Sequence, residues 1–394
     1  MDFNFTNEQQ LLQDTVQRFV QKDYTFEARK KIIKTPLGWS REAWKQFAEL
    51  GLLAIPFGEA HGGLGGNGVD SMILMDAFGR GLVLEPYLAT VVLAGSAIAA
   101  GAVAAQQDAL IPAIISGDLI AAFAHSEKQA RYELRNVETR AKRDGSGYVI
   151  DGAKSVVLHG DAADKLIVSA RTAGSARDAK GITLFLLDAK APGVTVRGYP
   201  TVDGLHAAEI GFKAVRVDGD AVVGEVDNAL PLIELVVDRG IAALCAEAVG
   251  IMDALNKATL EYAKTRQQFG VPIGRFQVLQ HRMAEMLIQF EQAKSMAYLA
   301  AVKADSPNVA ERQHALSAAK VQIGTSGRYI GQQAIQLHGG MGVTDELNVS
   351  HYFKRLTMID RTLGDVDTHL GKLGDRMLAE RAQPIPAVLK VSNG

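Results

Sequence analysis

The chain has 394 residues, 47% of them hydrophobic and 22% charged, which is typical of a globular protein with two or three domains. Its formal charge of -2 leaves no excess of cations to neutralise a nucleic-acid backbone, so nucleic acid is not expected as a partner. The single cysteine, Cys245, excludes an intramolecular disulfide and a cysteine-rich metal site.

Residues 1–5 lack the basic start and apolar run of a secretory signal, so the reducing cytosol is the expected compartment. Residues 86–105 carry no charge and have the length of a membrane span. This stretch is mostly Ala, Gly, Ser and Thr, and Gly95 and Gly101 interrupt it, so insertion into lipid would gain little. We therefore expect a buried helix there and no association with a membrane.

The first part of the chain predicts helices, because apolar residues such as Leu12, Val16 and Phe19 recur at near-helical spacing after Asn7. The glycine-rich stretch at residues 58–68 contains a formal GxGxxG pattern. Such a pattern indicates nucleotide binding only between a strand and a helix, and here helices are predicted on both sides. We interpret it as a solvent-exposed loop.

The hydrophobic period changes to that of strands between about residues 119 and 223 and returns to that of helices from residue 229. Without the alternation of a Rossmann fold, this order predicts an α+β protein. We expect an N-terminal helical domain at 1–118, a middle β-barrel domain at 119–224 and a C-terminal four-helix bundle at 225–394. The strand-like runs are 119–124, 147–152, 165–170, 182–187 and 194–197, and the long helical faces are 235–264, 276–302 and 310–337.

Two motifs in the C-terminal third indicate a ligand site. Residues 266–277 begin with Arg266, whose guanidinium can hold a diphosphate bidentately, and Phe269 supplies a ring beside it. About sixty residues later, Gly339, Gly340 and Gly342 follow an apolar helix and allow the backbone to approach a ligand closely. We interpret the pair as a flavin site; for the Arg266 turn alone, the alternative is a helix stop.

In this order and separation the motifs resemble the acyl-CoA dehydrogenase family, which oxidises acyl-CoA thioesters with FAD. The resemblance covers nearly the whole chain and is greatest to the small subunit of pimeloyl-CoA dehydrogenase-type enzymes. It implies an oligomer in which FAD lies across a subunit boundary. The residues that it places at the ADP half of FAD are Arg266, Gln268, Phe269, Phe276, Gln336, Leu337, Gly339 and Gly340.

The same resemblance places the isoalloxazine half against the β-domain, at Phe123, His125 and Ser126. The family's usual Pro, Gly and Ser are replaced after this strand by residues 128–131. Leu158 stands where the family has a Ser or Thr hydroxyl that bonds the flavin N5. His159, which follows it, is either a flavin neighbour or a polar turn residue.

The resemblance does not assign the base that removes the α-proton. Most members carry a Glu directly before a Gly-Thr pair, and here Leu363 occupies that position, followed by Gly364 and Asp365, which we expect near FAD. The backbone N–H of Leu363 can still bind the thioester oxygen. A minority of members place the base on the helix before the Arg-Phe-Gly turn, at a position that falls on Gly240 here.

Glu247 is our candidate for the base. It lies seven residues beyond Gly240, on nearly the same helix face and about 10 Å along the axis. It is a lone carboxylate among small apolar residues, where an unpaired charge would be costly without a purpose. The alternative is a carboxylate paired with an Arg of a neighbouring helix.

The predicted function is FAD-dependent α,β-dehydrogenation of an acyl-CoA, with electrons passed to an electron-transfer flavoprotein. The expected assembly is a homo-oligomer or a heterotetramer with a second acyl-CoA dehydrogenase subunit. One alternative is a non-catalytic or half-site partner subunit, and another is a non-enzymatic flavin- or acyl-CoA-binding homologue. No metal site is expected, although Asp365, Asp367 and His369 follow each other at alternate positions.

Overall fold

A computed structural model describes residues 4–381 of the chain. The N-terminal part is helical as predicted, and α1 starts with a capping box in which Thr6 and Gln9 each bond the other's backbone N–H. Its helices are α1 (Asn7–Lys22), α2 (Phe26–Ile32), α3 (Arg41–Glu49), α4 (Gly68–Gly81), α5 (Gly95–Gly101) and α6 (Ala104–Ile115), with short helical segments at Leu52–Ala54, Glu59–His61 and Leu88–Ala94.

The first part of the uncharged stretch that has the length of a membrane span is buried inside the protein. It forms the π-helix Leu88–Ala94, labelled η3, which continues directly into α5, and residues 89–98 are all buried. Within residues 4–381, no helix combines the length and the apolar character needed to cross a bilayer. The expectation of a buried helix is confirmed.

The middle part is an antiparallel-rich sheet. Its strands are β1 (Ala121–Ala124), β2 (Arg140–Asp144), β3 (Gly147–Leu158), β4 (Lys165–Arg171), β5 (Ile182–Asp188), β6 (Val194–Pro200), β7 (His206–Val217) and β8 (Val222–Val223). The five strand-like runs predicted from the sequence are β1, β3, β4, β5 and β6. We missed β2, β7 and β8; four of the five residues of β2 are charged, and only Ala141 is buried.

The hydrogen-bonded path of this sheet is β6-β7-β3-β2-β4-β5-β8, and β1 pairs in parallel with β4. Its end strands, β6 and β8, do not pair with each other, so the hydrogen-bonded path is open between them. The α+β fold class is confirmed. A separate core of residues such as Ile150, Val168 and Phe185 lies within the sheet domain.

The C-terminal part is a bundle around one long helix. Its elements are α7 (Leu230–Thr265), β9 (Gln267–Gln268), β10 (Val271–Pro272), α8 (Gln277–Lys303), α9 (Val309–His338), α10 (Asn348–Arg361) and α11 (Val366–Arg381), with short helical segments at Ile273–Arg275 and Gly339–Val343. Glycines allow α4 and α7 to touch: a Cβ on Gly250 would lie 1.9 Å from the carbonyl oxygen of Asp76. The N-terminal and C-terminal helices therefore share one core.

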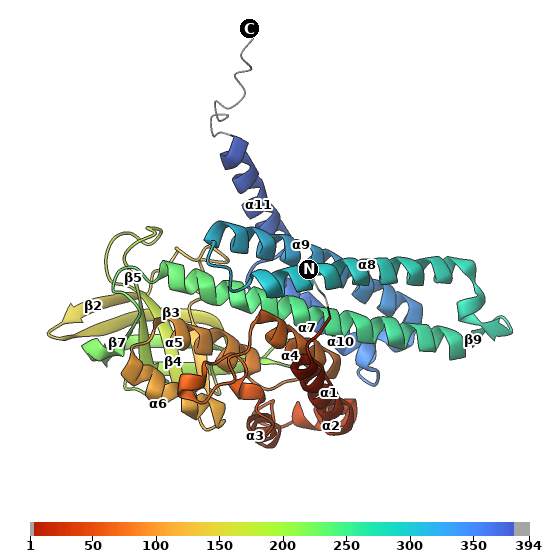
Figure 1. Cartoon of the computed structure of the whole chain (residues 1–394), viewed down its shortest axis with the longest axis horizontal. Coiled ribbons are helices and arrows are strands. Elements are labelled where there is room, and N and C mark those ends of the chain that lie inside the picture. The colour runs from red at the N-terminus through yellow and green to blue at the C-terminus, as the bar shows by residue number, and fades with distance from the viewer. Residues whose placement is uncertain (1–3, 382–394) are drawn as a thin grey trace, which may run out of the picture.

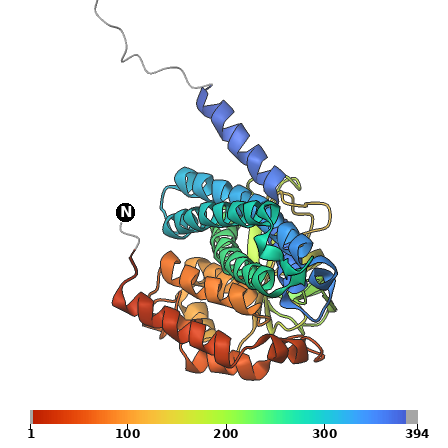
Figure 2. The same cartoon turned by 90° about the vertical axis from the view of Figure 1, so that its right-hand side faces the viewer.

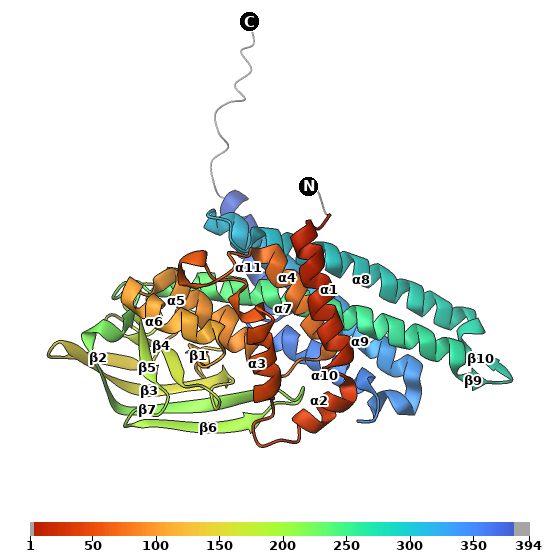
Figure 3. The ribbon, with the colours of Figure 1, turned by 60° about the horizontal axis from the view of Figure 1, so that its bottom comes forward.

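The two ends of α7 have different surroundings. The β-domain lies at one end, and the β9–β10 hairpin projects at the other, as Figures 1 and 3 both show. In Figure 2 the N-terminal helices lie on one side of α7, and α8 and α9 lie on the other, while α11 projects away from the bundle. These two ends hold the two halves of the candidate site.

Candidate active site

A cavity of about 690 Å³ lies between the β-domain and the end of α10, and we call it the flavin-side cavity. Phe123, His125, Ser126 and Leu158, which were predicted at the isoalloxazine half, all line it. Leu363, from the loop after α10, lines it as well. The fold thus brings β1, β3 and the α10–α11 loop together around one space.

The two positions where the family carries its base meet at this cavity. A Cβ on Gly240 would lie 2.6 Å from Cδ1 of Leu363 and 2.7 Å from Cδ2 of Leu93. Leu363 and Gly240 are therefore neighbours in space although they are far apart in the sequence. At these two positions the chain has an aliphatic side chain and a glycine instead of the family's carboxylate. Neither residue can accept a proton.

Lys320 and His369, which the sequence prediction missed, form hydrogen bonds to the loop that carries Leu363. The buried Lys320 Nζ donates to the carbonyl oxygens of residues 359, 360 and 364 at 2.8, 3.1 and 2.6 Å. His369 Nε2 lies 3.1 Å from the carbonyl oxygen of Leu363. Leu363 and Gly364 both have positive φ, 59° and 107°. The sequence signal that could have identified Lys320 is its charge at the end of the apolar run at 318–320.

Glu247 is buried in an ion pair and lines neither the flavin-side cavity nor the larger cavity described below. Arg355 of α10 donates to its two carboxylate oxygens at 2.5 and 2.7 Å, and Arg355 also bonds Asp203 at 2.8 Å. This geometry matches the alternative that we considered, a carboxylate paired with an Arg of a neighbouring helix. It argues against Glu247 as the base, because both carboxylate oxygens accept hydrogen bonds from Arg355 and the side chain does not reach the cavity.

A second buried ion pair supports the wall beside His125. Lys154 Nζ donates to Glu127 at 2.6 Å, to Ser169 Oγ at 2.9 Å and to the carbonyl oxygen of His125 at 3.2 Å. Burial lowers the pKa of His125 to about 3, so its ring is neutral and its Nδ1 bonds Ser169 at 2.9 Å. This cluster positions β1 against β3 and β4.

His159 is a polar turn residue rather than a flavin neighbour. It is buried, its Nε2 lies 3.0 Å from the carbonyl oxygen of Leu84, and it does not line the flavin-side cavity. Burial lowers the pKa of His159 to about 4, so the neutral ring donates this hydrogen bond. The bond ties the end of β3 to the N-terminal helices.

The predicted ADP-side residues lie at the hairpin end of α7. Arg266, Gln268 and Phe269 are exposed, and Phe269 is 92% exposed. Its ring meets Phe276 edge-on at 6.1 Å. The hairpin thus offers a guanidinium, an amide and an aromatic face to a ligand outside the chain's own core.

The second glycine motif lies beside the first. Tyr262, near the end of α7, stacks on His338 at the end of α9 with ring centroids 4.4 Å apart. This contact places Gln336, Leu337, Gly339 and Gly340 close to the hairpin end of α7. Leu337 is buried, and Gly339 has φ 57° with open space where a Cβ would stand. The fold brings the two sequence motifs together, as their pairing in one site requires.

These surroundings fit the two halves of FAD separately. The flavin-side cavity is lined by the apolar side chains of Phe123, Leu158 and Met358 and by polar groups such as Ser126. Such a mixed lining suits a planar aromatic ring with polar edges. The hairpin offers the donors for a diphosphate. Because the two sets lie at opposite ends of α7, one chain cannot place both around a single FAD (Figures 1 and 3).

A larger cavity of about 1000 Å³ adjoins the flavin-side cavity, and we call it the outer cavity. Arg131, Tyr132, Leu134, Val237 and Lys372 line both. Asp365 and Asp367 face the outer cavity. Asp365 also accepts hydrogen bonds from the backbone N–H and hydroxyl of Thr368 at 3.0 and 2.7 Å, so it caps the start of α11.

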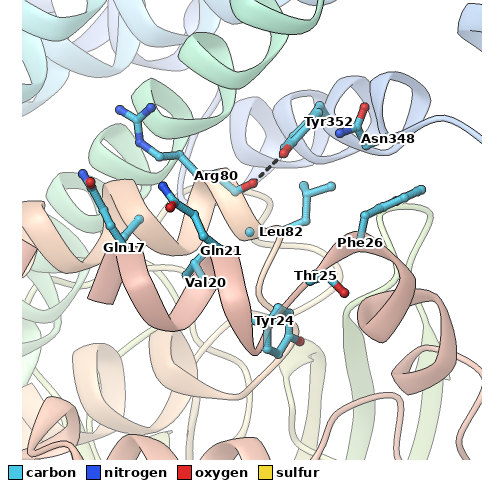
Figure 4. Close-up of a pocket in the computed structure, with 12 residues that line it drawn as sticks. Gln17, Val20, Gln21, Tyr24, Thr25, Phe26, Arg80, Leu82, Asn348 and Tyr352 are labelled. Atoms are coloured by element: carbon cyan, nitrogen blue, oxygen red, sulfur yellow. Dashed lines mark hydrogen bonds between the residues drawn. The ribbon is translucent and has the colours of Figure 1, made fainter. Parts of the chain in front are cut away.

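A further pocket, drawn in Figure 4, lies between α1, α4 and α10 and has a volume of about 310 Å³. Gln17, Arg80 and Tyr352 contribute to its wall, and the Tyr352 hydroxyl donates to the carbonyl oxygen of Arg80. It contains none of the predicted site residues. The candidate active site is therefore the flavin-side cavity together with the outer cavity.

Comparison with known proteins identifies the family. Three family models match the chain: "Acyl-CoA dehydrogenase, N-terminal domain" at residues 6–118, "middle domain" at 122–215 and "C-terminal domain" at 233–378. The probable acyl-CoA dehydrogenase YngJ of Bacillus subtilis is 30% identical over 366 residues, which cover 91% of this chain and 95% of that protein. The domain boundaries at 118 and 224 stay predictions.

Solved structures agree over nearly the whole chain. The FAD complex of PigA superposes with a TM-score of 0.89 at 26% identity, covering 97% of this chain and all of that one. The ChsE4-ChsE5 complex from Mycobacterium tuberculosis gives 0.86 at 27% identity, covering 98% and 100%. The narrower resemblance to pimeloyl-CoA dehydrogenase stays a prediction. With three consecutive family models and a full-length relative, the chain belongs to the acyl-CoA dehydrogenase family, as its two motifs predicted.

Proposed function

We propose that the chain takes part in the FAD-dependent α,β-dehydrogenation of an acyl-CoA thioester in the cytosol, with electrons passed to an electron-transfer flavoprotein. The observation that supports this most is the flavin-side cavity, where Phe123, Ser126 and Leu363 converge from three distant segments. An FAD held by these residues would supply the acceptor for the hydride that leaves the β-carbon. The adjoining outer cavity offers room for the CoA arm.

The chain's own residues serve binding and orientation in this proposal. The backbone N–H of Leu363 binds the thioester oxygen, and Lys320 and His369 hold its loop in place for that contact. Removal of the α-proton needs a base near the same carbon. Leu363 and Gly240 cannot serve, and Glu247 as the base stays a prediction that its ion pair with Arg355 argues against.

A half-site partner subunit is therefore the second candidate. In that arrangement the exposed Arg266, Gln268 and Phe269 hold the ADP half of an FAD whose flavin half lies in another subunit, which also supplies the base. The apolar contact of Leu363 with the Gly240 position is the observation that favours it. The similarity to the ChsE4-ChsE5 complex supports a heteromeric assembly.

Anaerobic titration of the purified protein with straight, branched, dicarboxylic and ring-bearing acyl-CoAs tests the proposal. Bleaching of the flavin absorbance by the chain alone supports the first candidate. If flavin absorbance or its bleaching appears only after co-expression with a second acyl-CoA dehydrogenase subunit, the half-site partner subunit is supported. Flavin retained without bleaching by any thioester in either preparation would instead support a non-enzymatic homologue.

A further inference from the structure

A third cavity lies next to the flavin-side cavity, about one helical turn further along α7. Its volume is about 320 Å³, and we call it the distal chamber. Residues of η3, α5 and α7 contribute to its wall. Among residues 4–381, no side chain lines both the distal chamber and either of the other two cavities. The distal chamber is therefore a separate space.

The wall of the distal chamber is apolar at depth and polar at the surface. Val91 and Ala243 are buried in its wall. At its rim Asn67 and Asp305 are exposed, and one carboxylate oxygen of Asp305 accepts hydrogen bonds from Arg239 at 2.8 and 3.0 Å. Because this ion pair neutralises the guanidinium at the rim, the interior suits an uncharged, apolar group.

An apolar wall separates the distal chamber from the flavin-side cavity. On α7, Val237 lines the flavin-side cavity and Ala243 lines the distal chamber, and Gly240 stands between them in the same i, i+3 row. On η3, Leu93 lines the flavin-side cavity, while its neighbour Val92 lines the distal chamber. The boundary therefore runs through Leu93 and Gly240.

Two leucine side chains close this boundary over the glycine. A Cβ on Gly240 would lie 2.7 Å from Cδ2 of Leu93 and 2.6 Å from Cδ1 of Leu363, so the two methyl groups fill the space above it. Leu93 is 4% exposed and belongs to a buried helical segment, where close packing leaves its side chain little freedom to move aside. Leu363 lies in a loop and is only half-buried. Leu93 is thus the firmer part of the closure.

An acyl group in the flavin-side cavity would meet this closure. In the proposed function the backbone N–H of Leu363 binds the thioester oxygen, and the outer cavity takes the CoA arm. The reacting carbons then lie beside Leu363 and Gly240, where the family's two base positions meet. A tail that continues from them toward α5 is stopped by Leu93 before it reaches the distal chamber.

We propose that Leu93 closes the acyl channel of this chain and limits its thioester substrates to short acyl groups. The distal chamber is the apolar space that a longer tail would enter if residue 93 were smaller. This inference rests on the proposed function and adds to it the length of the acyl group and the residue that sets this length. Shortening Leu93 would join cavities of about 690 and 320 Å³.

The test measures the affinity for acyl-CoAs of increasing length by calorimetry, with the protein in the oligomer in which it purifies. The ligands are acetyl-, butyryl-, hexanoyl-, octanoyl- and decanoyl-CoA, which share the same CoA arm. Leu93→Ala opens the closure. Leu74→Ala is the matched control, because Leu74 is a fully buried leucine of α4 that lines neither cavity.

Two further variants make the result independent of the folding of L93A. Leu363→Ala opens the same closure from the loop side, without removing a side chain from the buried helical segment. The double variant L93A/A243L opens the closure but fills the distal chamber from α7, because Ala243 lines that chamber.

We expect the affinity of the wild type not to rise beyond butyryl-CoA, because a longer tail finds no apolar space behind Leu93. In L93A and L363A, each methylene that enters the distal chamber should strengthen binding by up to about fourfold. L74A should show the same dependence on chain length as the wild type. L93A/A243L should lose the gain.

Three outcomes would overturn the role of Leu93. The first is a wild-type affinity that already rises with each methylene, which means that the tail takes another path. The second is the same dependence on chain length in L93A, L363A and wild type, and the third is a gain that persists in L93A/A243L. All three leave the proposed function intact. A wild type that binds none of the five thioesters would instead contradict the proposed function, and the role of Leu93 with it.

Discussion

The two ends of α7 contrast in what they keep of the family's site. At the β-domain end, Leu363, Gly240 and Leu158 stand where the family places its base and its flavin hydroxyl. At the hairpin end, Arg266 and Phe269 remain exposed and available to a ligand. The predicted contacts to the ADP half of FAD and the predicted position of the base thus lie at opposite ends of the same helix.

The largest effect is expected from restoring a carboxylate at the base position. Leu363→Glu should raise the rate of flavin bleaching by about 10²- to 10⁴-fold, because the apolar contact with Leu93 and the Gly240 position raises the pKa of a carboxyl toward neutrality. Stopped-flow absorbance with a saturating acyl-CoA measures it. Leu363→Gln is the matched control without a base, and a wild type that bleaches as fast as L363E would reveal a base elsewhere.

Replacing Glu247 tests whether it is structural. Glu247→Gln should lower the free energy of unfolding by about 3 kcal/mol, because the buried Arg355 loses a charged partner that accepts two of its hydrogen bonds. Urea unfolding measures this change, and the residual bleaching rate should stay the same. Glu261→Gln, an exposed carboxylate of the same helix paired with Lys264, should cost less than about 1 kcal/mol. Lost bleaching with unchanged stability would restore Glu247 as the base.

The pair Glu127–Lys154 predicts a pH dependence at the β-domain end. Burial acts to raise the pKa of Glu127, but the Lys154 ammonium outweighs it and lowers this pKa from 4.5 to about 2. The carboxylate therefore stabilises the fold above its unfolded pKa, and this contribution is lost as the pH falls toward about 2. Across that range, wild type should lose about 2 kcal/mol more than E127Q/K154M in urea unfolding. Equal losses would show that the pair does not set the dependence.

The smallest effect concerns the hairpin end. Arg266→Gln should weaken FAD binding by about tenfold, because a bidentate contact to the diphosphate is lost. Fluorescence titration measures it, and riboflavin affinity should not change. Arg275, exposed in the same hairpin region, supplies the control Arg275→Gln. If both variants bind FAD as the wild type does, Arg266 is a helix stop and the contrast between the two ends disappears.

Local patterns predicted most of the fold. The long C-terminal helices expected at 235–264, 276–302 and 310–337 are α7, α8 and α9. They could be predicted because the helical spacing of apolar residues is visible in the local sequence alone. β2 and β7 were not predicted, because pairing with neighbouring strands, and not their own composition, stabilises them as strands. β7 pairs with β3 on one side and β6 on the other, and β2 is mostly charged.

The sequence by itself determined the family, the order of the domains and the residues of the two motifs, since these are carried by periodicity and by residue type. Only the tertiary structure decided which residues meet. It placed Leu363 beside the Gly240 position and paired Glu247 with Arg355. Such contacts join positions more than a hundred residues apart, and their chemistry depends on burial and on partners that no local pattern contains.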